Sequence, residues 1–232
     1  MSTTNVIEIL RERIQCHFPL LFLTTHEEDR WESELATLAL DMERGLVIWT
    51  ATAGASPPLD SQTSDHRNPA DFLKQIADYP RDHVFLLKDF HPFLKDPFVV
   101  RRLRDAIPTL TEQNKTILLM DPDSKIPIEL QRDAMSLELP LPGLEDLRDE
   151  LRELLIQRQH QGEANLRLTA QQEEKLLKAV MGLTTKQVRQ ALSRALLGRS
   201  KVDNDVYAAL IAEKKHMVQG SDLLEFQELS EG

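Results

Sequence analysis

The sequence predicts an α/β core built on a five-stranded parallel sheet, followed by a small all-helical subdomain. Two observations lead to this prediction. Short and nearly continuous apolar runs alternate with amphipathic segments in the first part of the chain, which is typical of strands that helices cover on both faces. After Pro140 the strand-like runs cease, and apolar residues recur at helical spacing.

The core contains five predicted strands and five predicted helices. The strands are expected at residues 19–25, 45–50, 83–88, 115–120 and 135–139. The helices are expected at about 4–17, 26–43, 69–79, 96–111 and 127–132. Regular alternation of the two predicts right-handed crossovers and a layered domain. Residues 51–68, rich in Ala, Gly, Ser and Pro, are either a functional or a mobile loop, and we favour a mobile one because Leu59 is their one large apolar anchor.

The last third of the chain is expected to be a helical subdomain. An apolar stripe from Leu144 to Leu155 predicts its first helix, and further helices fit residues 169–181, 184–197 and 203–217. Gly182 is suited to end one of them and Thr184 to cap the next. We therefore expect a core over residues 1–141, a lid-like subdomain over 142–217, and a tail or linker over 218–232.

Composition excludes several classes of function. The 232 residues carry 28 Lys and Arg against 38 Asp and Glu, a net charge of −10, which disfavours binding to nucleic acids. No apolar run reaches the ~20 residues of a membrane span, and no secretory signal opens the chain. The single cysteine, Cys16, excludes internal disulfides and cysteine-based metal cages. We expect a location in the cytoplasm, or in the chloroplast stroma if the gene is plastid-encoded.

Three segments, in this order, are similar to parts of AAA-type ATPases. Residues 84–89 (VFLLKD) resemble the Walker B strand, whose terminal acid holds Mg²⁺, and Asp89 takes that position. Residues 116–121 (TILLMD) resemble the sensor strand and end in Asp121. Residues 182–192 resemble a lid helix that presents a nucleotide-sensing arginine, here Arg189.

The phosphate-binding loop of such enzymes has no counterpart in this sequence. Its Gly-x-x-x-x-Gly-Lys-Ser/Thr pattern brings backbone N–H groups and a lysine to the phosphates. After the first predicted strand stands TTHEEDR (residues 24–30) instead, whose three carboxylates would repel a triphosphate. The simplest interpretation is a capping box formed by Thr25 and Glu28 at the next helix.

The Walker B segment also lacks its catalytic base, because Phe90 follows Asp89. Asp89 and His91 could share a metal ion, but two ligands do not define a site. We favour Asp89 as the cap of a turn at Pro92 and interpret Asp121 and Asp123 as turn formers. No catalytic residue and no metal site is therefore predicted in this chain.

Several arginines are candidate contact residues. Arg101, Arg102 and Arg104 lie where AAA proteins place residues that face a neighbouring subunit, although a solvated helix face is the simpler interpretation. Arg189 and Arg194 fit a sensor role only if a nucleotide binds. Trp31 and Trp49 are most simply core residues.

One family resembles the whole chain. Residues 85–104 look like the N-terminal half of an AAA-type ATPase of cyanobacteria and chloroplasts, known as a conserved hypothetical plastid reading frame. Phe18-Pro19-Leu20, residues 25–30 and residues 213–226 add further matches. The resemblance implies a degenerate AAA-like half that precedes an ATP-binding half, with the strand order 5-1-4-3-2 of AAA cores. ATP and Mg²⁺ would then be cofactors of the second half only.

The expected function is that of a non-catalytic AAA-like module that works through protein contacts in an ATP-driven assembly. Its partners would be its own ATPase half or neighbouring subunits, and the full-length protein could be a homo-oligomer. Two alternatives stay open: a free-standing adaptor, and an enzyme that retains nucleotide binding. The sequence leaves undecided whether the chain is a truncated or a stand-alone form.

Overall fold

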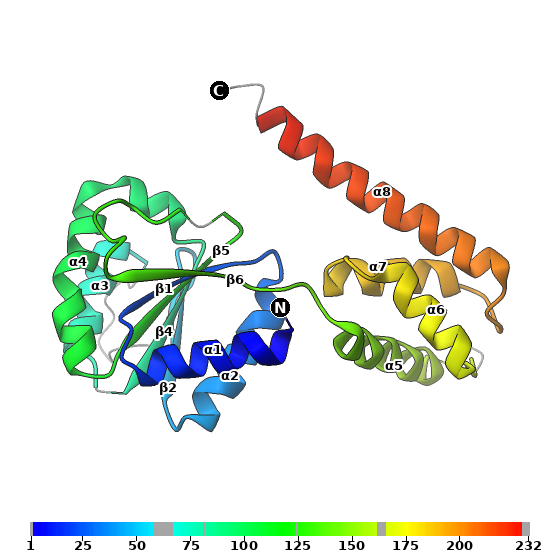
Figure 1. Ribbon diagram of the computed structural model, residues 1–232, viewed down its shortest axis with the longest axis horizontal. Helices are drawn as coiled ribbons and strands as arrows, with labels where there is room; N and C mark the ends of the chain where they lie inside the picture. Colours follow the sequence, from blue (N-terminus) through cyan, green and yellow to red (C-terminus); the bar gives the residue numbers. More distant parts are fainter. Residues whose placement is uncertain (1, 58–66, 81, 124, 162–165, 229–232) are drawn as a thin grey trace. The chain divides into compact units, whose positions relative to one another are not determined.

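The computed structural model describes residues 2–57, 67–80, 82–123, 125–161 and 166–228, with side chains as far as Val218. The chain forms two compact units, Met1–Pro140 and Leu141–Gly232. The first is an α/β layer structure and the second is helical (Figure 1). Much of the loop predicted over residues 51–68 lies outside the described residues.

The described residues of the first unit form a mixed sheet of six strands in the order β3-β2-β4-β5-β1-β6. Their bounds are β1 Leu20–Thr24, β2 Gly45–Thr50, β3 Gly54–Ser56, β4 His83–Lys88, β5 Thr116–Asp121 and β6 Ala134–Glu138. The five predicted strands are parallel neighbours in the expected order 5-1-4-3-2. The prediction of a five-stranded, wholly parallel sheet was nevertheless wrong.

The additional strand is β3, which pairs antiparallel with β2 at the edge of the sheet. Its three residues, Gly-Ala-Ser, have no apolar pattern, so no sequence signal marked it. The chain reverses over residues 51–53, where the backbone N–H of Ala53 donates to Thr50 Oγ1. Gly54 then adopts a φ of 74°, a conformation that costs glycine little. Backbone pairing with the exposed edge of β2 forms this strand, and the Ala55 side chain packs against the core.

Helices cover both faces of the sheet (Figure 1). Successive residues of each strand face opposite sides of the sheet. Those on one side pack with α1 and α2, and those on the other side pack with α3 and α4. The bounds are α1 Thr3–Gln15, α2 Glu28–Asp41, α3 Pro69–Asp78 and α4 Pro97–Glu112, with a short 3₁₀ helix η1 at His91–Lys95. The helix predicted over 127–132 is absent, because residues 128–133 form turns that bring the chain to β6. Six residues with one buried apolar side chain, Leu130, give a helix too little to bury.

An aromatic cluster fills the face covered by α3 and α4. Trp49 of β2 stacks on Phe72 of α3, with ring centroids 5.5 Å apart, and meets Phe90 edge-on at 5.4 Å. Trp49, Phe72 and Phe90 are fully buried. The prediction that both tryptophans belong to the core is confirmed, since Trp31 of α2 is also fully buried on the opposite face.

Lys115, just before β5, is fully buried in the same layer. Its Nζ donates to the carbonyl oxygens of Ile76 (2.8 Å) and Ala77 (3.0 Å) in the last turn of α3. These oxygens belong to the last carbonyls of the helix, which have no partner within the helix. Burial lowers the pKa of Lys115 below its usual value, while the charge of Asp78 acts in the opposite direction.

This lowered pKa predicts a stability that rises with alkaline pH. Between the folded pKa and about 10.5 the unfolded chain binds more protons than the folded chain, so the free energy of unfolding increases with pH. Lys115→Met removes the titrating group. Urea unfolding at pH 7 and pH 10 should show the wild type gaining stability relative to Lys115→Met at the higher pH. An unchanged difference between the two proteins would contradict the prediction.

In the residues that the structure describes, the second unit forms four helices around one apolar core. Their bounds are α5 Leu144–His160, α6 Ala170–Val180, α7 Thr185–Leu196 and α8 Asn204–Glu228. Thr169 and Thr184 form capping boxes with Gln172 and Gln187, and Gly182 has a φ of 87°, as expected at this break.

Helix α8 continues beyond its predicted end at residue 217 and runs to Glu228, through the segment expected to be a tail or linker. Residues 218–228 are mostly helix formers, and the single Gly220 costs only about 1 kcal/mol, too little to end a helix. Residues 229–232 lie outside the described residues.

Candidate functional site

The candidate site lies where β4 and β5 end. These neighbouring parallel strands pair Lys88 with Met120. Asp89 and Asp121 are the next residues after this pair. In open α/β sheets, ligands bind outside the carboxyl ends of the strands. The two residues that resemble the Walker B and sensor positions therefore lie together at the carboxyl ends of the strands, where such a site is expected.

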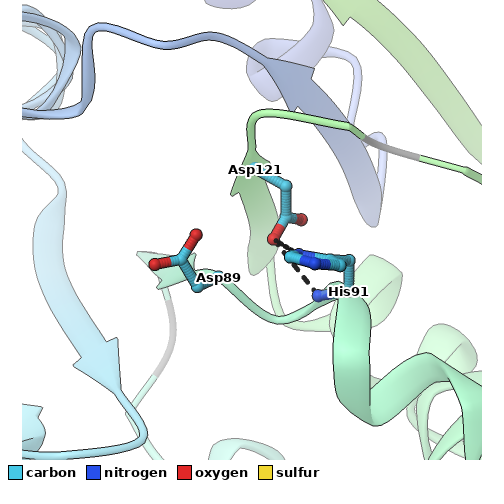
Figure 2. Close-up of side chains that lie close together, drawn as sticks. All are labelled: Asp89, His91 and Asp121. Atoms are coloured by element: carbon cyan, nitrogen blue, oxygen red, sulfur yellow. Dashed lines mark hydrogen bonds and ion pairs between the residues drawn. The ribbon is translucent and has the colours of Figure 1, made fainter. Parts of the chain in front are cut away.

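His91 lies near both aspartates and hydrogen-bonds one of them, Asp121 (Figure 2). Asp121 Oδ1 accepts two hydrogen bonds from His91, one from the backbone N–H at 3.1 Å and one involving Nδ1 at 2.9 Å. One ligand atom from each of Asp89, His91 and Asp121 lies within 4.8 Å of the other two. The interpretation of Asp121 as a turn former was wrong, because its side chain is fully buried and bonds the η1 turn from a neighbouring strand.

The turn after β4 is held by its backbone and by Phe90. Asp89 has a φ of 50°, which non-glycine residues adopt infrequently, and its N–H donates to Met120 O at 3.0 Å. This conformation turns Phe90 into the aromatic cluster while Asp89 stays exposed. Phe90, and not Asp89, is the N-cap residue of η1, which has no side-chain cap. The prediction that Asp89 caps the Pro92 turn was therefore wrong.

Burial dominates the electrostatics of Asp121. Loss of solvent raises the pKa of the Asp121 carboxyl above its usual value, and the nearby Asp89 carboxylate adds to the rise. Hydrogen bonds and charge from His91 oppose it without cancelling it. The second oxygen, Oδ2, is buried and has no hydrogen-bond partner among the described residues. A buried carboxylate oxygen without a partner is costly.

The connection from β1 to α2 occupies the place of a phosphate loop. Only residues 25–27 join the strand to the helix. Glu27 is buried, and its carboxylate accepts from Arg30 Nη1 at 2.9 Å. Arg30 also donates to Pro140 O (2.9 Å) and to Thr3 Oγ1 (2.5 Å). Sequence reasoning missed this network, because nothing local distinguishes a buried Glu-Arg pair from a solvated one.

The predicted capping box of Thr25 and Glu28 does not form. Glu27 is the residue before the first helical position, and Thr25 Oγ1 accepts from the N–H of Glu27 at 3.0 Å. Glu28 instead reaches Lys88 at the end of β4, at 2.6 Å, and Glu32 reaches the same Nζ at 2.5 Å. Burial would lower the pKa of Lys88, but the two glutamates outweigh it and raise that pKa. The acidic first turns of α2 thus bind a lysine of this chain.

The arginines of α4 are mostly exposed. Arg101 pairs with Asp105 at 2.7 Å, and the Arg102 guanidinium lies over the Phe98 ring, 5.1 Å from its centroid. Arg101 and Arg104 line a cavity of about 280 Å³ between α4 and the chain around Pro127. Their expected role at a subunit interface stays a prediction.

Arg189 and Arg194 connect helices of the second unit. Arg189 on α7 bonds Glu150 and Glu153 of α5. Its pKa is raised, first by the hydrogen bond to Glu150. Arg194 bonds Glu213 of α8. Both guanidinium groups therefore have carboxylate partners within the unit, and a sensor role for Arg189 stays a prediction.

Two family models match the chain in succession. The N-terminal domain of the SpoVK-like AAA ATPase covers residues 6–139, and the second domain of the same family covers residues 145–221. The chain belongs to the SpoVK-like AAA ATPase family. The two matched segments correspond to the two compact units.

Curated relatives of this family member include AAA domain-containing proteins named ycf46. The chain is 28% identical to that of Trieres chinensis over 94% of its length, 25% identical to that of Pyropia yezoensis over 96%, and 26% identical to that of Guillardia theta over 92%. It covers 43%, 44% and 42% of those proteins, and so spans less than half their length. The family resemblance inferred from the sequence is confirmed.

Solved structures confirm the AAA-like fold. C. elegans PCH-2 matches with a TM-score of 0.57 and 9% identity over 94% of this chain and 69% of its own. A Thermotoga maritima RuvB mutant matches with a TM-score of 0.56 and 13% identity, over 92% of this chain and 69% of its own. Domain III of the Thermotoga maritima replication initiation protein DnaA matches with a TM-score of 0.55 and 12% identity, over 91% of this chain and 92% of its own. Within the described part of the chain, no helix has the length and apolar character needed to cross a membrane.

Proposed function

We propose that this chain is a non-catalytic AAA-like module that acts through protein contacts in an ATP-driven assembly. ATP and Mg²⁺ would bind in a second, ATP-binding half or in neighbouring subunits, and not in this chain. Family membership supports an ATPase context. The share of the ycf46 relatives left uncovered is long enough for a further ATPase module. Cytoplasm or chloroplast stroma is the proposed location.

The observation that carries this proposal is the connection from β1 to α2. A phosphate loop surrounds the β-phosphate with backbone N–H groups and supplies a lysine. Here three residues make the connection, and a buried glutamate bonded to Arg30 takes the corresponding place. Glu28 and Asp29 add negative charge to the first turn of α2. A triphosphate would face carboxylates where AAA enzymes offer N–H groups and a lysine.

The missing base leads to the same conclusion. Phe90 takes the position that follows the Walker B acid, and its ring is fully buried among Trp49 and Phe93. No side chain at this position can orient a water for attack, a role that phosphoryl transfer requires. The fold retains the AAA-like architecture without these parts of the hydrolytic machinery.

We predict that the chain neither hydrolyses nor tightly binds ATP. Phosphate release with Mg-ATP should stay at background, and Asp89→Ala should leave it there. Calorimetric titration with ATP and ADP, with Mg²⁺ present, should show no saturable heat below millimolar nucleotide. Phosphate release that Asp89→Ala abolishes would contradict the proposal, and nucleotide binding without turnover would favour the alternative of a retained nucleotide site.

The contact role has its own test. A ycf46 relative that carries both halves is compared with a variant that lacks the residues aligned to this chain. We expect deletion to change the oligomeric state measured by light scattering, or to change the ATPase rate per subunit. If deletion changes neither, the module is not part of the assembly, and the adaptor alternative is favoured.

A further inference from the structure

We infer that Asp89, His91 and Asp121 form a binding site for a divalent transition-metal ion, with Zn²⁺ or Mn²⁺ as the fitting class. Three ligand atoms of suitable chemistry, one from each residue, lie within 4.8 Å of one another. They come from the ends of two neighbouring strands and from the start of η1, which follows β4 in the chain (Figure 2). The inference does not depend on whether the chain binds ATP.

The spacing of the His91 and Asp121 ligand atoms suits a metal ion. Ligand atoms about 2.1 Å from one ion are about 3 Å apart when at right angles and about 4.2 Å apart when opposite. His91 Nδ1 and Asp121 Oδ1 are 2.9 Å apart, close to the first value. A metal ion would replace the proton that these two atoms share, and the exposed side chain of Asp89 supplies the third candidate ligand.

An independent observation points to a missing ligand at this site. The Asp121 side chain is fully buried, and Oδ2, the oxygen of its carboxylate that does not contact His91, has no hydrogen-bond partner among the described residues. Lys88 directly precedes Asp89. Its ammonium group forms ion pairs with Glu28 and Glu32 on α2. A buried carboxylate with an unsatisfied oxygen gains more from a cation than an exposed one does, because little water competes.

The ligand set determines the class of ion. Imidazole nitrogen favours Zn²⁺, Fe²⁺ or Ni²⁺ over Mg²⁺ and Ca²⁺, and two carboxylates also suit Mn²⁺. The His91 side chain is 39% exposed and Asp89 is exposed, so water can fill the remaining coordination positions. A bound ion would cross-link the ends of β4 and β5 and hold the η1 turn in place.

The test is titration of the metal-free full chain with Zn²⁺ by calorimetry, and with Co²⁺ by visible absorption, without nucleotide. We expect one saturable site in the wild type. Asp89→Asn and His91→Gln should each weaken it at least tenfold, in line with the loss of a ligand. The matched control is Asp123→Asn, which removes a neighbouring exposed carboxylate that pairs with Lys125. It should bind as the wild type does.

Two outcomes would overturn the inference. One is the absence of saturable Zn²⁺ or Co²⁺ binding below millimolar metal. The other is equal binding by the wild type and the Asp89→Asn/His91→Gln double variant, which would place the metal on other histidines. Circular dichroism shows whether each variant is folded, and Asp89→Asn, at an exposed position, keeps the test valid if His91→Gln unfolds. A site that binds Mg²⁺ as tightly as Zn²⁺ would contradict the assigned role of His91.

Discussion

Replacing Arg30 with alanine should lower the free energy of unfolding of the first unit by about 3–5 kcal/mol, the usual cost of removing one partner of a buried ion pair. The Arg30 side chain is 11% exposed and that of Glu27 is 2% exposed. Arg30 also bonds Thr3 and Pro140 and lies over the Trp31 ring. The substitution removes all of these contacts and leaves the buried Glu27 carboxylate without its guanidinium partner.

Urea unfolding followed by tryptophan fluorescence measures this loss, because both tryptophans lie in the first unit. Arg11→Ala is the matched control, since the Arg11–Asp41 pair is at the surface and should contribute less than about 1 kcal/mol. The double variant Glu27→Gln/Arg30→Met, which removes both charges, should lose less than Arg30→Ala. If Arg30→Ala costs no more than Arg11→Ala, the network does not stabilise the connection as argued.

Trp49→Ala should be similarly destabilising, by about 3–5 kcal/mol, because a fully buried indole leaves a large cavity. Trp49 contacts Phe72 of α3 as well as Phe90 and Phe93, which flank His91 in the η1 turn. Loss of the indole therefore loosens the layer between β2, α3 and η1. Zn²⁺ binding at the proposed site should weaken together with stability.

Fluorescence of the remaining Trp31 reports unfolding of Trp49→Ala, and calorimetry reports its metal binding. Trp49→Phe preserves much of the packing and should be less destabilising than Trp49→Ala. Phe98→Ala is the exposed control, since this residue is 56% exposed, and should change stability by less than about 1 kcal/mol. A Trp49→Ala protein as stable as Phe98→Ala would show that the cluster does not support this layer.

The strand order shows how far sequence reasoning extends at the site. The predicted order already made the strands before Asp89 and Asp121 neighbours, and the structure confirms that order. The carboxyl ends of adjacent parallel strands lie on the same side of a sheet. The predicted strand order therefore implied that the two aspartates lie close together. The turn interpretation of Asp121 concealed it, because Pro122 suggested a local role.

The sequence by itself determined the alternation of strands and helices, the parallel core, the helical second unit and the family, since these depend on apolar periodicity and on local motifs. The tertiary structure alone decided the burial of Asp121 beside His91, the Glu27–Arg30 network and the edge strand Gly54–Ser56. Each of these three features depends on groups that lie far apart in the sequence or on backbone pairing. Charge and burial at such places are properties of packing, which a local pattern does not encode.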